Sequence, residues 1–388
     1  MNICFLTSEF PNLRSGGVEN VTYRLILALA ARGNDVGCIS LGHPPIEMDV
    51  PFRHLCVGQI ADIESAISNF LYIYKIDVVI NQSIELKWEY AIKAIRPLFP
   101  NIKFIKSLHT DPAYAIKAVR DCEPSYISSG DLDRMIYRFS PITMLRRFRR
   151  HMYLKSRYRD WIKLYDAIVL LSSHVMDEFK GIAGVKSCNK LVNISNPVDL
   201  IGRDVDIRKQ NLVLYVGRLH HEAKRPDRLL AVWRKISKLF PDWELVFVGD
   251  GLLRPAMEQY CTNNGLINVR FVGQADPAPY YAKASILCIS STSEGFSLVC
   301  AEAISSGVIP IAFNSYRAVN DLIRDEYNGV LVSPFNLDEY AKKLAKIMGD
   351  RAYSEKIRDN IINSTYLYKM SMDSVVNQWN ELFYKLCM

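Results

Sequence analysis

Short apolar runs alternate with segments of helical periodicity along most of the chain. In the first half, the apolar runs predict strands at residues 2–7, 35–41, 77–81, 102–108, 167–172 and 190–194. Apolar residues at helical spacing predict helices at residues 18–32, 60–74 and 84–96, and a further helix from His174. Strands that alternate with helices are typical of a parallel sheet covered on both faces. The pattern therefore predicts a doubly wound α/β domain over residues 1–197.

The same alternation returns in the second half, after a polar linker at residues 202–210. Apolar runs predict strands at residues 211–216, 243–248, 269–272, 286–289, 308–313 and 328–332. Helical segments fill the remainder of the chain to Met388. We expect a second α/β domain over residues 198–370, because 388 residues are enough for two domains of ordinary size.

One predicted strand, turn and helix in the second half contains several candidate binding residues close together in the sequence. The apolar run Ile286 to Ile289 leads through a polar turn, Ser290 to Gly295, into a helix predicted over Phe296 to Ser306. The first backbone N–H groups of a helix, at the positive end of its dipole, form an anion site. Glu294 precedes this site and Glu302 follows it, and the rise between them is about 12 Å, comparable to a sugar–diphosphate–ribose unit. Alternatively, Glu294 caps the helix and Glu302 is a solvated helix residue.

This stretch resembles the E-x7-E signature of the retaining GT-B glycosyltransferases of family 4, in which the wording EGF-x-L-x-x-x-EA is typical. The resemblance covers nearly the whole chain. It implies a GT-B fold, with two Rossmann-like doubly wound domains facing each other across a central cleft, and with residues 371–388 packing back on the first domain. In this stretch it implies that the donor sugar is contacted by Glu294, Gly295 and Phe296. It further implies that Glu302 contacts the ribose, and that Ser297 and Leu298 contact the diphosphate.

Two features of the first half fit the same family. Gly16 and Gly17 end a polar loop before the first helix, where either a plain tight turn or a nucleotide-binding loop explains them. The resemblance places both near the donor diphosphate. His109 stands at the carboxyl end of a predicted strand, where ligands of parallel sheets bind, and is either structural or a site residue. The resemblance assigns it to the transferred sugar near the reacting centre, with Asp111 as a weaker neighbour.

Arg218 and Lys224 follow the first predicted strand of the second half. Two cations at the end of a strand can converge on one diphosphate and neutralise the charge of a leaving group, although surface charge is the alternative. The segment matches the family's G-R-L…K motif, so the resemblance assigns both cations to the diphosphate, while Arg225 stands where many members have Gly. It also places the backbone of Val272 and Gly273 near the nucleotide base.

Neither a metal site nor another cofactor is expected. The nine cysteines stand singly, without a C-x-x-C pair, which indicates buried thiols in a reducing compartment. The D-x-D triplets at residues 131–133 and 204–206 lie in polar sequence without a preceding apolar strand, which indicates chance rather than a metal motif. The co-substrate implied by the resemblance is a nucleotide sugar.

The net charge of +7 is uneven, because eight Lys and Arg stand against one acid between Met144 and Lys163. The segment combines basic and aromatic residues, namely Arg146, Arg147, Arg149, Arg150, Phe148, Tyr153, Tyr158 and Trp161. A solvated helix face, a nucleic-acid patch and a patch for anionic lipid all fit such a run. The aromatic residues favour the membrane surface over nucleic acid, since no nucleic-acid-binding motif accompanies them. With no long apolar stretch and no signal-peptide pattern, we expect a cytoplasmic protein that contacts the inner face of the membrane.

The expected function is transfer of a sugar, with retention of configuration and without a metal, from a nucleotide diphosphate sugar to a hydroxyl of a glycan or lipid-linked acceptor. Family habit favours a UDP-sugar over a GDP-sugar and a role in lipopolysaccharide, O-antigen or capsule synthesis. Catalysis would then be electrostatic and positional, and Glu294 and Glu302 would bind the donor rather than act as an acid/base pair. The alternatives are a GT-B nucleotide-sugar epimerase, a phosphorylase, and a non-catalytic module that binds nucleotide sugars or a membrane surface.

Overall fold

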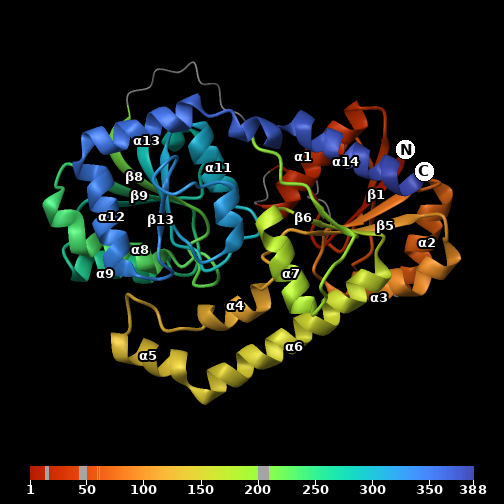
Figure 1. Ribbon diagram of the computed structural model, residues 1–388, viewed down its shortest axis with the longest axis horizontal. Coiled ribbons are helices and arrows are strands. Elements are labelled where there is room, and N and C mark those ends of the chain that lie inside the picture. Colours follow the sequence, from red (N-terminus) through yellow and green to blue (C-terminus); the bar gives the residue numbers. More distant parts are fainter. Residues whose placement is uncertain (14–16, 43–49, 59, 61, 200–208) are drawn as a thin grey trace. The chain divides into compact units, whose positions relative to one another are not determined.

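The computed structural model describes residues 1–13, 17–42, 50–58, 60, 62–199 and 209–388 (Figure 1). These residues form two compact units, and each unit is built on one parallel sheet. The first unit comprises Met1–Pro112, Lys155–Pro197 and Lys369–Met388. The second comprises Ala113–Leu154 and Val198–Tyr368.

The sheet of the first unit has seven parallel strands in the order β3-β2-β1-β4-β5-β6-β7. The strands are β1 (Asn2–Thr7), β2 (Asp35–Ser40), β3 (Arg53–Cys56), β4 (Val78–Asn81), β5 (Lys103–Leu108), β6 (Ala167–Leu170) and β7 (Leu191–Asn193). The main helices are α1 (Val18–Ala31), α2 (Ile63–Ile73), α3 (Leu86–Ile95), α7 (Met176–Ala183) and α14 (Met372–Cys387). The strand order reverses between β1 and β4, as in a doubly wound nucleotide-binding fold.

Helix α14 completes the core of the first unit. Trp379 and Phe383 belong to the same buried cluster as Phe5 of β1. At the start of α14, Asp373 pairs with Arg32 at 2.7 Å. The C-terminal segment thus packs on α1, beside which it lies in Figure 1.

The sheet of the second unit has six parallel strands in the order β10-β9-β8-β11-β12-β13. The strands are β8 (Gln210–Val216), β9 (Glu244–Val248), β10 (Val269–Gly273), β11 (Ala284–Ile289), β12 (Ile309–Phe313) and β13 (Val330–Val332). The helices of its second segment are α8 (Pro226–Ile236), α9 (Arg254–Asn263), α10 (Ala278–Lys283), α11 (Leu298–Ser305), α12 (Leu337–Gly349) and α13 (Arg351–Asn363). Short 3-10 helices occur in both units, at Arg96–Leu98, Ser173–Val175, Ser237–Leu239, Arg317–Asp321 and Tyr366–Met370. Here the strand order reverses between β8 and β11, so the prediction of two doubly wound domains is confirmed.

Residues 113–154, which we call the arm, depart from the expected domain boundary. The arm contains α4 (Tyr114–Asp121), α5 (Asp131–Phe139) and the first half of α6 (Pro141–Leu164). The arm groups with the second unit, although the predicted first domain, 1–197, included it. Hydrogen bonds explain the grouping, because Asp227 of α8 accepts from Ser125 Oγ at 3.1 Å and from the Tyr126 N–H at 3.0 Å.

Two smaller differences concern single elements. The edge strand β3 was not predicted, because its residues are polar or only partly buried and give no apolar run. Helix α11 begins at Leu298, two residues after the predicted start at Phe296.

All nine cysteines are free thiols, and burial raises the pKa of Cys38 and of Cys288 to about 12. Within the described residues, no helix is both long enough and apolar enough to cross a membrane.

Candidate functional site

The predicted donor residues of the second unit lie on two loops that meet at the carboxyl ends of β8 and β11. Arg218 and Lys224 follow β8, and Glu294 follows β11, its neighbour in the sheet. The loops are joined by their backbones, since the Thr292 N–H donates to the carbonyl oxygen of Ala223 at 2.6 Å. This is the point where the strand order reverses, and parallel sheets bind their ligands there.

Lys224 and Glu294 are in direct contact. Lys224 Nζ donates to Glu294 Oε1 at 2.7 Å, and Ser291 Oγ donates to the same oxygen at 2.7 Å. The two side chains are 23% and 10% exposed, so water screens the pair only partly. A ligand that enters this site meets a cation and a carboxylate already fixed beside each other.

Arg218 lies on the same loop with its side chain exposed. Its carbonyl oxygen accepts a hydrogen bond from the hydroxyl of Tyr215, at 3.2 Å. Burial raises the pKa of Tyr215, and the negative charge of Glu294 raises it further, while Arg218 opposes the shift. Tyr215 is therefore a neutral hydroxyl among the charges of the site, and nothing in the motif pattern indicated it.

The start of α11 has the features of an anion site. Ser297 is the N-cap residue, but its side chain makes no capping hydrogen bond. Its hydroxyl is buried and, among the residues that the structure describes, has no hydrogen-bond partner. A buried hydroxyl without a partner is costly, and a phosphate oxygen at the N-terminus of a helix would satisfy it. Phe296 is buried beside this turn and Leu298 is the first helical residue.

Glu302 is not a freely solvated helix residue. The hydroxyl of Tyr281 in α10 donates to Glu302 Oε2 at 2.9 Å, and Tyr281 is fully buried. Burial, followed by the negative charge of Glu302, raises the pKa of Tyr281. The buried hydroxyl of Tyr281 thus orients the carboxylate of Glu302. The sequence pattern did not predict this contact.

Val272 and Gly273 end β10, two strands away from β8 in the same sheet. The carbonyl oxygen of Gly273 accepts a hydrogen bond from the Gly249 N–H at 2.8 Å. Gly273 has a φ of 83°, a left-handed conformation that glycine adopts without strain. The residues assigned to the base therefore lie at the same edge of the sheet as Lys224 and Glu294.

The remaining predicted site residues belong to the first unit. His109 Nε2 lies 3.2 Å from Ser107 Oγ, and its Nδ1 is buried without a hydrogen-bond partner in the described part of the chain. Burial, followed by the positive charge of Lys106, lowers the pKa of His109 to about 3, so the ring is neutral at physiological pH. Asp111 is buried. Gly17 is the N-cap residue of α1 at φ 65°, and Gly16 lies outside the described residues.

A lysine that the sequence pattern did not single out lies beneath His109. Lys106 of β5 is fully buried, donates to the carbonyl oxygen of Ser83 and has its Nζ 4.9 Å from the ring centre of Trp161. Burial lowers the pKa of Lys106 to about 7, while the charge of Glu89 opposes that shift. In its protonated form, Lys106 contributes to lowering the pKa of His109.

The predicted basic and aromatic patch is only partly at the surface. Arg146, Arg147, Arg149 and Arg150 are all exposed. Tyr158 and Trp161, however, are fully buried in the first unit, and Tyr158 donates to the carbonyl oxygen of Pro112 at 2.5 Å. These two aromatic residues are core residues and not surface residues, so the prediction for them was wrong.

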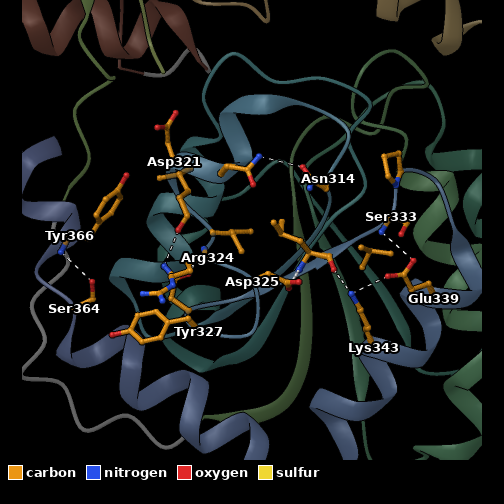
Figure 2. Close-up of a pocket in the computed structure, with 17 residues that line it drawn as sticks. Asn314, Asp321, Arg324, Asp325, Tyr327, Ser333, Glu339, Lys343, Ser364 and Tyr366 are labelled. Carbon is orange, nitrogen blue, oxygen red and sulfur yellow. Dashed lines mark hydrogen bonds and ion pairs between the residues drawn. The ribbon is translucent and has the colours of Figure 1, made fainter. Parts of the chain in front are cut away.

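A cavity of about 900 Å³ lies beside β13, the edge strand of the second sheet (Figure 2). Asn314, Asp325, Ser333 and Lys343 are among its lining residues, and none of the predicted donor residues lines it. Several of its polar groups bond one another or the backbone; Lys343, for example, donates to the carbonyl oxygen of Leu331 at 2.6 Å. At β8 and β11, by contrast, a cation and a carboxylate lie together beside the N-terminus of α11.

Within the described residues, no group of three or more His, Cys, Asp or Glu is placed to hold a metal ion. Asp131 and Asp133 instead serve the start of α5. Asp131 pairs with Arg134, and Asp133 accepts from the Gly130 N–H at 3.2 Å. The second D-x-D triplet, residues 204–206, lies outside the described residues.

Comparison with known proteins gives two family matches that together span most of the chain. The family described as Glycosyltransferase Family 4 matches residues 15–201, and Glycosyl transferases group 1 matches residues 201–365. One relative is the GalNAc-α-(1→4)-GalNAc-α-(1→3)-diNAcBac-PP-undecaprenol α-1,4-N-acetyl-D-galactosaminyltransferase of Campylobacter jejuni, 32% identical over 45% of this chain and 49% of that protein. Another is the amylovoran biosynthesis glycosyltransferase AmsD of Erwinia amylovora, 25% identical over 56% of this chain and 62% of that protein.

The chain thus spans about half the length of the first curated relatives that it matches. Among solved structures, HepE of Anabaena in complex with UDP and glucose has the same fold, with a TM-score of 0.72. The alignment covers 99% of this chain and 100% of that chain, at 17% identity.

Proposed function

Because the chain belongs to the GT-B glycosyltransferases of the family 4 type, we propose that it transfers a sugar from a nucleotide diphosphate sugar to a hydroxyl of a glycan or lipid-linked acceptor. The contact between Lys224 and Glu294 at the end of β8 and β11 carries the proposal. A cation suited to a diphosphate and a carboxylate suited to sugar hydroxyls lie at adjacent points, beside the N-terminus of α11.

In the proposed reaction, the departing diphosphate gains negative charge that Lys224, Arg218 and the first N–H groups of α11 stabilise. Glu294 holds hydroxyls of the donor sugar, and Glu302, oriented by Tyr281, holds the ribose. His109 is neutral, so it can act as a hydrogen-bonding group toward the sugar rather than as an acid. The acceptor attacks on the face from which the diphosphate leaves, with retention of configuration and without a carboxylate nucleophile.

We infer that no metal ion is required. Arg218 and Lys224 already supply positive charge where the diphosphate leaves, which is one of the tasks that a metal performs in other transferases. The described D-x-D triplet is engaged at the start of α5, which favours a structural role for it.

A UDP-sugar is the proposed donor, and cell-surface polysaccharide the proposed product. HepE of Anabaena was solved with UDP, and AmsD of Erwinia amylovora is a glycosyltransferase of amylovoran biosynthesis. The relative in Campylobacter jejuni acts on a sugar chain carried by PP-undecaprenol, which supports a lipid-linked acceptor here.

A donor screen tests the proposal. The purified chain is incubated with UDP-sugars and GDP-sugars, with and without EDTA, and release of the nucleotide is followed. We expect release from one UDP-sugar that persists in EDTA and is lost in Lys224→Ala and Glu294→Ala but kept in Lys238→Ala, an exposed lysine of the same unit. Absence of calorimetric binding of any nucleotide would refute the donor site, and conversion of the donor without an acceptor would favour an epimerase.

A further inference from the structure

Helix α5 of the arm carries its apolar side chains away from the protein. Leu132, Met135, Ile136 and Phe139 occupy positions i, i+3, i+4 and i+7, which share one face of a helix. These side chains are 62%, 53%, 61% and 70% exposed. A surface helix normally buries such a face against the core, so α5 has the reverse orientation.

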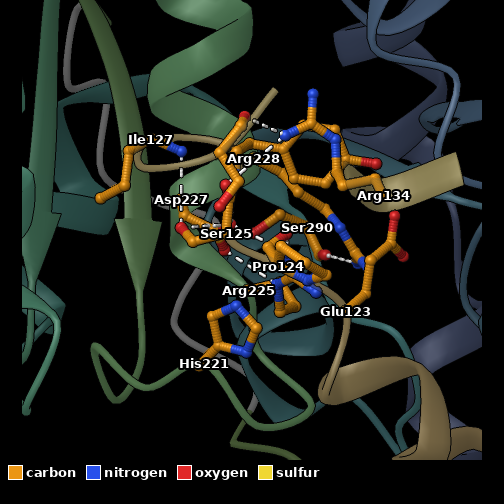
Figure 3. A network of polar contacts seen from close by, with 12 residues as sticks. Glu123, Pro124, Ser125, Ile127, Arg134, His221, Arg225, Asp227, Arg228 and Ser290 are labelled. Atoms are coloured by element: carbon orange, nitrogen blue, oxygen red, sulfur yellow. Dashed lines mark hydrogen bonds and ion pairs between the residues drawn. The ribbon is translucent and has the colours of Figure 1, made fainter. Parts of the chain in front are cut away.

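The opposite, polar face of α5 is the one that packs on the protein. Arg138 lies 2.6 Å from Glu123, whose side chain has no exposed surface. Arg134, which belongs to the polar network drawn in Figure 3 and is 8% exposed on its side chain, donates to the carbonyl oxygen of Ser129 at 2.6 Å. The hydroxyl of Tyr137 donates to the carbonyl oxygen of Val119 at 2.7 Å. Rotation of α5 to bury the apolar face would leave the carboxylate of Glu123 buried without this cation, at high cost.

The first half of α6 extends this apolar surface along the chain. Ile142, Leu145, Phe148 and Met152 are 64%, 54%, 61% and 46% exposed. We call the combined set the apolar stripe: Leu132, Met135, Ile136, Phe139, Ile142, Leu145, Phe148 and Met152. With Met144, which is 56% exposed, nine large apolar side chains are exposed within 21 consecutive residues. This differs from the scattered pattern of an ordinary surface, and such surfaces mark interaction sites.

Positive charge accompanies the apolar stripe. Arg146, Arg147, Arg149 and Arg150 are all exposed on the same part of α6. No acidic residue occurs between Asp133 and Asp160. Apolar side chains combined with arginines in this way suit the boundary between the acyl chains and the phosphates of an anionic bilayer.

We propose that the arm docks on an anionic lipid bilayer, with the apolar stripe in the headgroup region and the four arginines on lipid phosphates. A nucleic acid would leave the apolar stripe exposed to water, because a phosphate backbone offers it no partner. A second copy of the chain would bring equal clusters of arginines face to face across a two-fold axis. An anionic bilayer offers a partner to both the apolar stripe and the arginines.

The arm is attached to the rest of the second unit by hydrogen bonds to a buried ion pair. Arg225 and Asp227 have no exposed side-chain surface, and Asp227 also accepts from Ser125 and Tyr126 of the arm (Figure 3). Arg225 follows Lys224 directly and has a φ of 49°, a conformation in which glycine is unstrained. The bilayer would therefore hold the donor-binding unit, a consequence that rests on the proposed function, whereas docking itself rests only on the surface of the arm.

Vesicle flotation of the full chain tests the proposal. We expect the chain to float with vesicles of phosphatidylglycerol and phosphatidylcholine, to remain unbound with phosphatidylcholine alone, and to be released by salt. Ile136→Ser/Phe139→Ser and Arg147→Glu/Arg150→Glu should each lower the partition coefficient at least about tenfold. The matched controls Leu252→Ser/Ile267→Ser and Lys238→Glu/Lys342→Glu, all at exposed positions of the same unit, should bind as the unaltered chain does.

Three results would overturn the proposal. One is absence of flotation with anionic vesicles, and another is equal loss of binding in the stripe variants and their controls. The third is a dimer in sedimentation equilibrium that the stripe variants abolish, which would assign the apolar stripe to a second copy. Calorimetric binding of UDP is measured in every variant, so failure of the donor site and failure of the docking surface are distinguished.

Discussion

The buried pair of Arg225 and Asp227 gives a sharp test of how the arm is held. Nε and one terminal nitrogen of Arg225 each lie 3.0 Å from a carboxylate oxygen of Asp227. Asp227→Ala would leave the guanidinium buried without its partner, which costs about 3–5 kcal/mol. It would also remove the hydrogen bonds from Ser125 and Tyr126, worth about 1 kcal/mol each.

Arg225→Gly should be milder, although it breaks the same pair. The substitution removes the cation from a left-handed backbone position and so relieves about 1–2 kcal/mol of strain. Asp227 would keep its two hydrogen bonds from the arm and the nearby charge of Arg228. We expect Arg225→Gly to cost at least about 2 kcal/mol less than Asp227→Ala, and the double variant to be less destabilised than the sum of the two.

Hydrogen exchange followed by mass spectrometry is the appropriate assay, because two units need not unfold as one transition. Peptides from residues 113–139 and from α8 report the stability of the arm and of its attachment. Asp227→Ala should lower protection in both, with α14 of the first unit as the internal control. Unchanged protection of the arm in Asp227→Ala, or equal losses in the two single variants, would refute the reasoning.

The same pair predicts a dependence on pH. Burial alone would raise the pKa of Asp227, but hydrogen bonds and charge from Arg225, with smaller effects from the Tyr126 N–H and Arg228, lower it to about 2. The folded carboxyl thus loses its proton more readily than the unfolded one, whose pKa is about 3.9. Its contribution to stability is complete above about pH 4 and is lost as the pH falls toward 2. Protection of the arm should fall over this window, and the fall should be smaller in Asp227→Ala.

Three further predictions concern the donor site and the first unit. Arg228→Met removes the 3.0 Å hydrogen bond to the carbonyl oxygen of Ser290, which lies in the loop that leads to the donor site. This substitution should raise the KM for the donor about tenfold, while kcat changes less. Tyr281→Phe removes the hydrogen bond to Glu302 and should raise the same KM about three- to tenfold with kcat unchanged, as steady-state kinetics will measure. Burial lowers the pKa of Lys106 to about 7, below the value of about 10.4 in the unfolded chain. The free energy of unfolding of the first unit, measured by urea titration, should therefore rise from pH 7 to 10. In Lys106→Met this rise should be smaller.

Exposed residues of the same types provide the controls. Arg234→Met, on the outer side of α8, should leave the KM for the donor unchanged, and so should Tyr384→Phe in α14. Lys93→Met, at an exposed position of α3, should keep the dependence of stability on pH. A loss of kcat equal to the loss of kcat/KM in Tyr281→Phe would show that Glu302 acts in the transition state rather than in donor binding.

The central strands were predictable because strands buried on both faces must be apolar throughout. All residues of β4, β6 and β11 are buried, and each appears in the sequence as an apolar run. The edge strand β3 obeys no such constraint, since Arg53 and His54 are exposed, and it was missed. Apolar runs therefore indicate burial first and strand structure only as its consequence.

The candidate site was predictable only where a motif fixed the residues. Lys224 and Glu294 were expected because they match motif positions of the family. They are 70 residues apart, however, and no periodicity in the sequence predicts their contact. Tyr281 could not be inferred, because its hydrogen bond to Glu302 depends on how α10 and α11 pack. Residue types at motif positions are thus fixed by chemistry, whereas their partners are fixed by the fold.

Helix α6 shows why composition alone cannot locate a lipid-binding surface. Phe148 and Tyr158 lie on the same basic and aromatic helix, but Phe148 is 61% exposed and Tyr158 is fully buried. The difference comes from what each turn packs against: Arg157 pairs with Glu89, and Tyr158 donates to the carbonyl oxygen of Pro112, whereas the first turns of α6 leave their apolar side chains exposed. The arginines near Phe148 remain available to lipid phosphates, while Arg157 already neutralises a carboxylate. The proposed bilayer contact must therefore stop short of the buried half of α6, which is why the substitutions that test it lie between residues 136 and 150.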